Sequence, residues 1–408
     1  MPGAGEGFPA ALSGFAGRLD GAFIRDVLGR EPLFLERAVV EDGGEVGGGV
    51  EDGEKVGGGV EDGGGSTDLD EDECPTHARG WAFAPDTLQN PVPFPAGVAW
   101  SPHADGAWDR RRKVWTLPTP PVADDDAFER VLTALAPALG IDVGATEELS
   151  RPTEDGDVAV AFSGGIDSAL LAAGRPGVPL YVVGFEGSHD LAAAREAAEA
   201  MGRLDDLREI RLTHDELRRW VPRVANATRR TNAMDVSIAL PLAIVAERAA
   251  ADGCEALAVG QGADELFGGY AKVVDPADDA RVDATTVRGA VRESIATLPD
   301  QLGRDVPAIR AAGVDVVAPY LQDRVVDAAL RLPGSLLVEE GTRKVALRRF
   351  AARTGALPRS VWTAEKKALQ YGTYVSRELD RLARRNGFKR RMNRHVDRYV
   401  ESLVAETE

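Results

Sequence analysis

The stretch VAVAFSGGIDSALLAAG, residues 158–174, places two glycines, two serines and an aspartate directly after small apolar residues. The apolar run predicts a buried strand that ends at Phe162, and the following apolar period predicts a helix from about Ile166. Glycines in the turn let the backbone approach a ligand, and a helix start presents free N–H groups and a positive dipole end. This arrangement predicts a phosphate-binding loop. The residues expected to hold the phosphates are Ser163, Gly164, Gly165 and Ser168.

Asp167 lies inside this loop, where a phosphate would repel its carboxylate unless a cation lay between them. Mg²⁺ prefers carboxylate and phosphate oxygens, so Asp167 is predicted to be a magnesium ligand. The simpler alternative is a strand-to-helix turn capped by an aspartate, which needs no ligand. The complete pattern Ser-Gly-Gly-Ile-Asp-Ser between a strand and a helix favours nucleotide binding.

A second glycine-rich motif, VGQGADELFGGY at residues 259–270, also follows a short apolar run. Its acidic residues stand where a helix would start, and the alternative is that Asp264 and Glu265 only cap that helix. Two carboxylates from separate strand ends can hold a cation against a pyrophosphate. We therefore expect Asp264 to be the second magnesium ligand, facing Asp167.

Short apolar stretches typical of buried strands alternate with alanine-rich stretches of helical period, which predicts an α/β fold with a parallel sheet covered on both faces. Ligands in such folds bind at the carboxyl ends of the strands, where both glycine-rich motifs stand. The last 80 or so residues are expected to be mostly helical. The predicted strands are residues 157–162, 180–185, 207–212 and 255–260.

Composition divides the chain into parts. Residues 40–73 repeat the unit Val-Glu-Asp-Gly and are predicted to be a flexible insertion, because so few apolar side chains cannot offset the chain entropy. Residues 1–39 have a mixed composition that could fold, residues 74–121 suggest short strands and turns, and the two segments are expected to form one domain. Residues 122–408 contain the predicted α/β domain.

Both motifs resemble those of a known superfamily. The first resembles the pyrophosphate loop of the N-type ATP pyrophosphatases, which cleave ATP between the α and β phosphates and adenylylate their substrates. The second resembles the Gly-Glu-Gly-(Ala/Ser)-Asp-Glu-(Leu/Val)-Phe-Gly-Gly-Tyr segment of asparagine synthetases. The resemblance covers most of residues 18–375 and is strongest in the two motifs. It implies an ATP pyrophosphatase domain with a helical C-terminus, and ATP and Mg²⁺ as cofactors.

The resemblance also implies roles for single residues. Lys344 matches a lysine that contacts the phosphates and stabilises charge during adenylylation, although a lone helix lysine could equally be solvated surface. Ser188 and Asp190 would follow the adenine-binding strand, unless they belong to an ordinary loop. Lys366 and Lys367 match a phosphate- or substrate-contacting segment only loosely. The catalytic residues implied are Lys344, Asp167 and Asp264, and the nucleotide-binding residues are Ser163, Gly164, Gly165, Asp167, Ser168, Val183, Gly184, Gly260, Gln261 and Gly262.

The N-terminal part carries the resemblance in a damaged form. The segment LDGAFIRDVLGREPLF looks like part of the glutaminase (Ntn-type) domain of these enzymes, which is mostly β. An intact glutaminase needs a cysteine after the initiator methionine as its nucleophile. Here residue 2 is Pro2, and no cysteine appears before Cys74. We therefore expect a truncated remnant without glutamine hydrolysis.

Gln261 departs from the family pattern, which has a glutamate there that has been viewed as a proton-handling group. Glutamine cannot act as a general base. Either water or another acid takes the amine proton here, or the nucleophile is not ammonia, or the acceptor is not aspartate. Three hypotheses follow: ammonia-dependent asparagine synthesis through β-aspartyl-AMP, another adenylylating amide- or ring-forming ligase or RNA-modifying enzyme, and a non-catalytic ATP-binding regulator.

The formal net charge is −18, with 66 acidic residues against 48 basic ones, of which seven are lysines. This composition resembles that of proteins from extreme halophiles and argues against a general nucleic-acid surface. The basic stretch KRRMNRH at residues 389–395 is predicted to be a solvated helix face. Two cysteines and five histidines without ligand spacing indicate neither disulfides nor zinc.

The length and the apolar pattern bear on where the chain works. No apolar run has membrane-spanning length and no signal peptide is evident, so a cytoplasmic protein is expected. The expected partners are small molecules, namely aspartate or a related carboxylate and ammonia. The resemblance is also compatible with a homodimer.

Overall fold

The computed structural model describes residues 14–19, 22–41, 80–100, 112–120, 126–142, 158–364, 372–391 and 393–407. Most of the predicted insertion at residues 40–73 lies outside these ranges, and so do Lys366 and Lys367. The two glycine-rich motifs and Lys344 lie within them.

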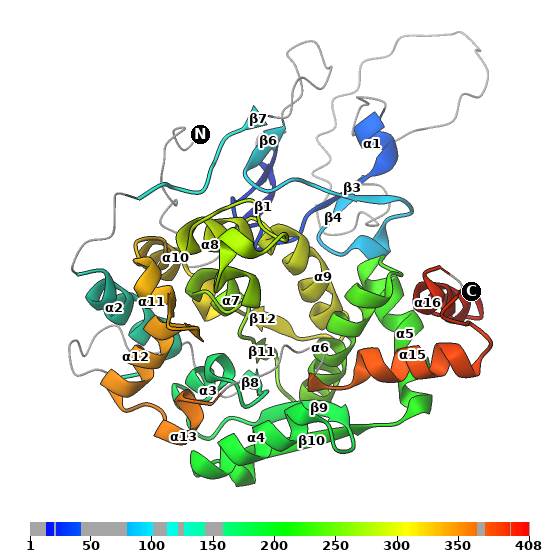
Figure 1. The fold of residues 1–408 in the computed structure, drawn as a ribbon. Helices are drawn as coiled ribbons and strands as arrows, with labels where there is room; N and C mark the ends of the chain where they lie inside the picture. The colour runs from blue at the N-terminus through cyan, green and yellow to red at the C-terminus, as the bar shows by residue number, and fades with distance from the viewer. Residues whose placement is uncertain are drawn as a thin grey trace, which may run out of the picture.

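A five-stranded parallel sheet forms the centre of the larger part of the molecule (Figure 1). Its strands stand in the order β10-β9-β8-β11-β12, and every neighbouring pair runs parallel. The four strands predicted from the sequence are present, and β12 is a fifth that the sequence analysis did not identify. The strands are β8 Val158–Ala161, β9 Leu180–Phe185, β10 Leu207–Leu212, β11 Ala256–Ala258 and β12 Asp315–Val317.

Both faces of this sheet are buried, as successive residues of β9 show. Leu180 and Val182 belong to one large apolar cluster, whereas Tyr181 and Val183 belong to the other. Neighbouring side chains of a strand point to opposite faces, so a strand buried on both faces has an uninterrupted apolar sequence. The predicted α/β fold with a covered parallel sheet is confirmed.

Helices cover both faces, and α9 (Leu298–Arg310) contributes to both clusters. The helices of the first cluster are α2 Ala127–Leu139, α3 Ile166–Ala173, α4 His189–Ala200, α7 Ala263–Phe267, α8 Val287–Ile295, α10 Asp323–Leu330, α11 Gly334–Leu337, α12 Val345–Thr354 and α13 Arg359–Trp362. Those of the second are α5 His214–Thr228, α6 Ala233–Ala251, α15 Val375–Arg385 and α16 His395–Ala405. The C-terminal part is therefore mostly helical, as predicted. Within the described ranges, no helix has the length and apolar character needed to cross a membrane.

The basic stretch at residues 389–395 differs from its prediction. Its described residues ahead of His395, which begins α16, form the segment that links α15 to α16 instead of a helix face, because α15 ends ahead of Gly387, whose φ is 92°. The side chains of Arg390 and Arg394 are 71% and 61% exposed and pair with nearby aspartates, so the predicted solvation is confirmed.

The described residues between 14 and 113 form a separate small unit, which we call the N-terminal module. It contains two antiparallel sheets, of strand order β1-β2-β6-β7 and β4-β3-β5, around its own apolar core that includes Phe23, Phe94 and Trp100. In Figure 1 it lies at the top of the view, above α8 and α9. Its elements are β1 Ala16–Leu19, β2 Ala22–Arg25, β3 Phe34–Glu36, α1 Arg37–Glu41, β4 Trp81–Ala82, β5 Pro91–Pro93, β6 Val98–Trp100 and β7 Arg112–Lys113. The domain boundaries and the kinship to a glutaminase stay predictions.

The helix that carries the first motif packs closely on α2. A Cβ added to Gly174, at the end of α3, would lie 1.8 Å from the carbonyl oxygen of Leu139, the last residue of α2. The obstructing atom belongs to the backbone, so no rotamer change can relieve the overlap.

We expect Gly174→Ala to lower the unfolding free energy by about 1–3 kcal/mol, because α2 and α3 must move apart. Gly334→Ala is the matched control, since its Cβ would meet Val287 at 3.6 Å, an ordinary contact. Chemical unfolding of both variants measures the difference. Equal stabilities would contradict the close approach.

Candidate active site

The first glycine-rich loop follows β8 and leads into α3, as predicted. Gly164 has φ 74°, and a Cβ there would lie 2.4 Å from the carbonyl oxygen of Ala193, so glycine is required. The hydroxyl of Ser168 donates to the carbonyl oxygen of Gly165 at 3.1 Å and accepts from the amide of Ser163 at 3.2 Å. The loop therefore gathers two hydroxyl groups beside the start of a helix.

The second loop follows β11 and touches the first. A Cβ added to Gly260 would lie 3.3 Å from the Cβ of Asp167. Gly262 has φ 89°, and a Cβ there would lie 2.4 Å from Leu321, so this turn also needs glycine. Asp264 stands in the first turn of α7. The carboxyl ends of β8 and β11, which are neighbours in the sheet, thus bring both motifs together.

Lys344 joins the two predicted carboxylates. Its Nζ lies 2.5 Å from Oδ2 of Asp167 and 2.7 Å from Oδ1 of Asp264. The lysine side chain is only 11% exposed. Burial alone disfavours the ammonium, but the charges of Asp167 and Asp264 outweigh it and raise the pKa of Lys344 above its ordinary value. The ammonium is therefore kept charged between the two carboxylates.

The backbone around this ammonium is constrained. Lys344 itself has φ 57°, a left-handed conformation that is costly for a residue with a side chain and recurs at functional sites. A Cβ added to Gly269 would lie 1.7 Å from Oδ1 of Asp264 and 2.4 Å from Cε of Lys344. The glycine pair after α7 thus leaves room for the ion pair.

The carboxylate pair meets the requirements of a Mg²⁺ site shared with a phosphate. Across the described ranges, no cluster of three or more His, Cys, Asp or Glu residues could hold a metal. Mg²⁺ beside a nucleotide commonly takes one or two carboxylates, with phosphates and water completing its shell. Asp167 and Asp264 both contact one cation, the ammonium of Lys344, so they lie close enough to share another.

The residues predicted near the adenine lie at the carboxyl end of β9, next to β8 in the sheet. A Cβ on Gly184 would lie 2.4 Å from the hydroxyl oxygen of Ser188, which stands at the start of α4. Val183 and Asp190 are both buried. The structure thus brings these residues to the same edge of the sheet as the two loops, and their contact with adenine stays a prediction.

Glu265 has a different environment from its neighbour Asp264. It is buried, and the hydroxyl of Tyr270 donates to its carboxylate. Burial, and then the charge of Asp264, raises the pKa of Glu265.

The fully buried Tyr320, which the sequence analysis did not single out, donates its hydroxyl to the carbonyl oxygen of Asp167 at 2.9 Å. The strand β12 precedes Tyr320 in the chain. Recognising β12 in the sequence would therefore have placed Tyr320 at the carboxyl edge of the sheet, beside the two loops.

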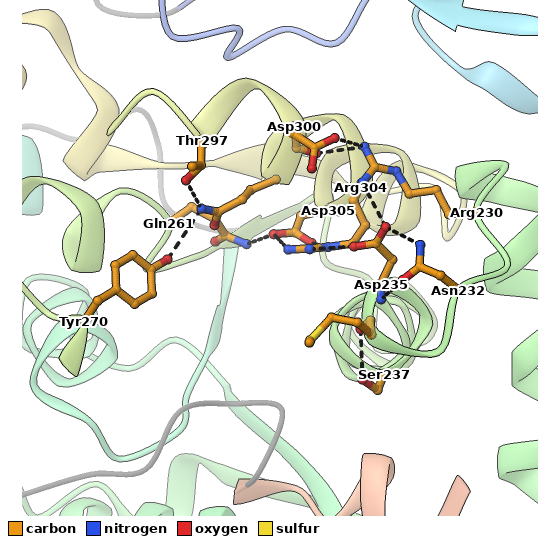
Figure 2. Close-up of polar contacts among 12 residues, drawn as sticks. Arg230, Asn232, Asp235, Ser237, Gln261, Tyr270, Thr297, Asp300, Arg304 and Asp305 are labelled. Atoms are coloured by element: carbon orange, nitrogen blue, oxygen red, sulfur yellow. Dashed lines mark hydrogen bonds and ion pairs between the residues drawn. The ribbon is translucent and has the colours of Figure 1, made fainter. Parts of the chain in front are cut away.

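Gln261 points toward a partly buried chain of charges that the sequence analysis also missed (Figure 2). Its amide nitrogen donates to Oδ2 of Asp305 at 3.3 Å. Arg304 holds Asp305 with two nitrogens, at 2.7 and 3.2 Å, and reaches Asp235 at 3.0 Å. Arg230 binds the other oxygen of Asp235 at 3.0 Å.

This chain supplies a physical reason for glutamine at position 261. An ionised carboxylate only accepts hydrogen bonds, so Asp305 must receive the NH₂ group of Gln261, and the amide oxygen stays available for another donor. A glutamate at this partly buried position would face the buried Asp305 as a second negative charge. Gln261 and Asp305 are therefore a matched pair.

Comparison with known proteins agrees with the fold and the loops. The family described as "Asparagine synthase" matches residues 150–286 and 281–404, which together make up more than half of the chain. With its parallel sheet and helical C-terminal part, the structure is that of an ATP-pyrophosphatase domain. The chain belongs to the asparagine synthase family.

Individual relatives are more distant. A Methanocaldococcus jannaschii protein that carries the name of a glutamine-hydrolyzing asparagine synthetase is 29% identical to this chain over 285 residues. The match covers 61% of this chain and 52% of the relative's length. Asparagine synthetase B of Escherichia coli is 26% identical over 201 residues, or 45% and 35% of the two chains. A Dictyostelium discoideum protein that carries the name of a glutamine-hydrolyzing asparagine synthetase is 25% identical over 312 residues, which cover 70% of this chain and 54% of the relative's length. The chain spans about half the length, or less, of these curated relatives.

We expect Gln261→Glu to lower the unfolding free energy at neutral pH by about 1–3 kcal/mol, because it sets a second carboxylate beside the buried carboxylate of Asp305. Adding Asp305→Asn should recover part of this loss, since the new amide at position 305 can donate to the carboxylate introduced at position 261. Chemical unfolding of the two single variants and the double variant measures the coupling, and additive losses would contradict the matched pair. Gln322→Glu is a control, because its amide oxygen already accepts from Arg324.

The pKa of Asp235 leads to a second prediction. Burial alone would raise it, but hydrogen bonds from Asn232 and Arg304 and the charge of Arg230 lower the pKa of Asp235 below its ordinary 3.8. The stability that this carboxylate contributes is therefore present above pH 3.8 and is lost as the pH falls through the folded-state value.

Asp235→Asn should lower the unfolding free energy at neutral pH by about 1–3 kcal/mol, because two arginines lose a charged acceptor. The difference from the parent should shrink in acid below pH 3.8. Chemical unfolding across this pH range measures it, with Asp300→Asn, at a side chain that is 77% exposed, as the control. A difference that persists unchanged in acid would overturn the assignment.

Proposed function

We propose that the protein is an ATP-dependent carbon–nitrogen ligase that adenylylates a carboxylate and then joins it to an amine. The observation that carries the proposal is the convergence of Asp167 and Asp264, from two separate glycine loops, on the buried ammonium of Lys344. Membership of the asparagine synthase family supports it. Such a cluster of two carboxylates and one cation suits the handling of a charged pyrophosphate.

The proposed reaction has two displacements. A substrate carboxylate oxygen attacks the α-phosphorus of ATP, the bond to the β-phosphate oxygen breaks, and pyrophosphate leaves. The amine nitrogen then attacks the acyl carbon, AMP leaves, and the nitrogen loses a proton. When bound, Mg²⁺ supplies positive charge that neutralises the departing pyrophosphate.

Residues of this chain are assigned the remaining tasks. The first loop binds phosphate through its hydroxyl groups and the N–H groups at the start of α3. Asp167 and Asp264 would hold the metal, and Lys344 would stabilise the negative charge that gathers at the phosphates. Val183 and Gly184 would contact the adenine. The proposed nucleotide-binding residues are Ser163, Gly164, Gly165, Asp167, Ser168, Val183, Gly184, Gly260, Gln261 and Gly262.

For the substrates we propose aspartate and free ammonia, with asparagine as the product and no glutamine hydrolysis. The relatives' names support aspartate as the carboxylate and asparagine as the product. The sequence-based prediction of a truncated glutaminase remnant without the nucleophilic cysteine supports ammonia as the nitrogen source.

The contact between Gln261 and Asp305 favours a second candidate, a ligase with a different amine or carboxylate. Position 261 offers an amide oxygen, which accepts an N–H group but cannot remove a proton as a general base. Such a site would suit an amine whose proton passes to water or to a basic group of the substrate itself.

Pyrophosphate release from ATP, measured in high salt with aspartate and ammonium added or withheld, tests the proposal. Release that depends on aspartate and yields asparagine supports the first candidate. Release without asparagine supports the second, once other amines and carboxylates are supplied. ATP binding without release under any of these conditions would reject both and leave a non-catalytic regulator.

Asp167→Asn should reduce turnover by about 100-fold or more, because it removes a charge beside the reacting phosphates. Asp327→Asn makes the same exchange at an exposed side chain on α10 that pairs with Arg331, and it should leave turnover unchanged. Steady-state pyrophosphate release by both purified variants measures the effect. Full turnover by the Asp167 variant would refute its proposed role.

A further inference from the structure

One short segment, the 3-10 helix Pro319–Leu321 between β12 and α10, touches both glycine loops. The hydroxyl of Tyr320 donates to the carbonyl oxygen of Asp167 at 2.9 Å in the first loop. Leu321 fills the space beside Gly262 in the second loop, where a Cβ would lie 2.4 Å from its Cδ2. The position of this segment therefore affects both loops at once.

Arg30 of the N-terminal module holds this segment in place. Its Nη1 donates to the carbonyl oxygen of Leu321 at 2.9 Å and to Oδ1 of Asp323 at 2.5 Å. Its Nε donates to Oδ1 of Asp26 at 3.1 Å. One guanidinium thus joins the module to the residues that follow β12.

This contact is buried, and Nε and Nη1 of the guanidinium have the partners just described, whereas Nη2 has none among the described residues. Arg30 is 8% exposed, and its partners Asp26 and Asp323 are 1% and 8% exposed. Asp26 also accepts from the backbone amides of Leu28 and Arg30, at 3.0 and 3.1 Å, which fixes its carboxylate. Buried charges are tolerated only with good pairing, and the forked guanidinium supplies a geometry that other cations cannot reproduce.

Other arginines fasten the module elsewhere. Arg229, after α5, donates to the carbonyl oxygen of Leu88 at 2.9 Å. Arg310 on α9 pairs with Glu31 at 2.8 Å, through side chains that are 33% and 32% exposed. These contacts attach the module without reaching the segment 319–321. Glu31 therefore offers a matched comparison for its neighbour Arg30.

We propose that Arg30 is a positioning residue of the ligase site, and that the N-terminal module orders both glycine loops through it. Arg30 fixes the carbonyl of Leu321, the segment fixes the hydroxyl of Tyr320, and that hydroxyl fixes the backbone of Asp167. Displacements of an ångström or less at such a site are costly for catalysis. The catalytic part of this inference rests on the proposed function, whereas the ordering of the loops does not.

Three full-length variants test the proposal. Arg30→Lys keeps a positive charge between Asp26 and Asp323 but loses the fork. Tyr320→Phe keeps the packing and removes one hydrogen bond. Glu31→Gln removes the ion pair with Arg310 from the same interface and serves as the control.

Hydrogen exchange followed by mass spectrometry supplies a readout that needs no activity. Amides of residues 163–168 and 260–264 should exchange roughly tenfold faster in Arg30→Lys and Tyr320→Phe, and at the parental rate in Glu31→Gln. Parental exchange in Arg30→Lys, or equal acceleration in Glu31→Gln, would overturn the proposal whether or not the protein releases pyrophosphate.

Turnover supplies the second readout. Arg30→Lys should lower kcat about tenfold while the KM for ATP changes less than about twofold, because the loops lose alignment and keep their binding groups. The double variant with Tyr320→Phe should lose little more than either single variant. Fully multiplicative losses, or an equal loss in Glu31→Gln, would count against Arg30 as a positioning residue. A parent protein without pyrophosphate release would refute the proposed function instead, and exchange would still decide the ordering of the loops.

Discussion

The ammonium of Lys344 lies between the carboxylates of Asp167 and Asp264, and these residues come from three segments that are far apart in the sequence. Two carboxylates this close together repel each other unless a cation separates them, and here that cation is the buried ammonium. The glycines of both loops, the left-handed backbone of Lys344 and the order of β8 and β11 in the sheet all serve this arrangement.

Much of the fold and the centre of the site could be predicted from the sequence, because their signals are local. Three of the four predicted strands are uninterrupted apolar runs, the fourth, Leu207–Leu212, mixes apolar and charged residues, and each carboxylate stands beside glycines at a strand end. The sequence analysis missed β12 because its three residues, Asp315–Val317, are too few to show a period. It also missed the partners of Gln261 and Asp167, since Asp305 and Tyr320 are 44 and 153 positions away.

The N-terminal module shows how a separate core can still belong to a neighbouring site. Its apolar cluster is its own, yet arginines on both sides of the interface donate to backbone carbonyls across it. A guanidinium satisfies several acceptors at once, so a few such residues can fix the relative position of two surfaces. Arginine, which makes up most of the basic residues of the chain, thus also fastens the N-terminal module to the larger part of the molecule.

The burial of Arg30 also has a consequence for ionic strength. Dissolved ions screen exposed pairs such as Arg211 with Glu186, whose side chains are 56% and 78% exposed, over a few ångströms in concentrated salt. They do not enter the space between Arg30, Asp26 and Leu321, where nearly all water is excluded. In concentrated salt, most attractions between exposed charges weaken. The contact that joins the module to the loops is buried and therefore escapes this screening. The order that it imposes on the loops should then persist at salt concentrations that weaken the exposed ion pairs.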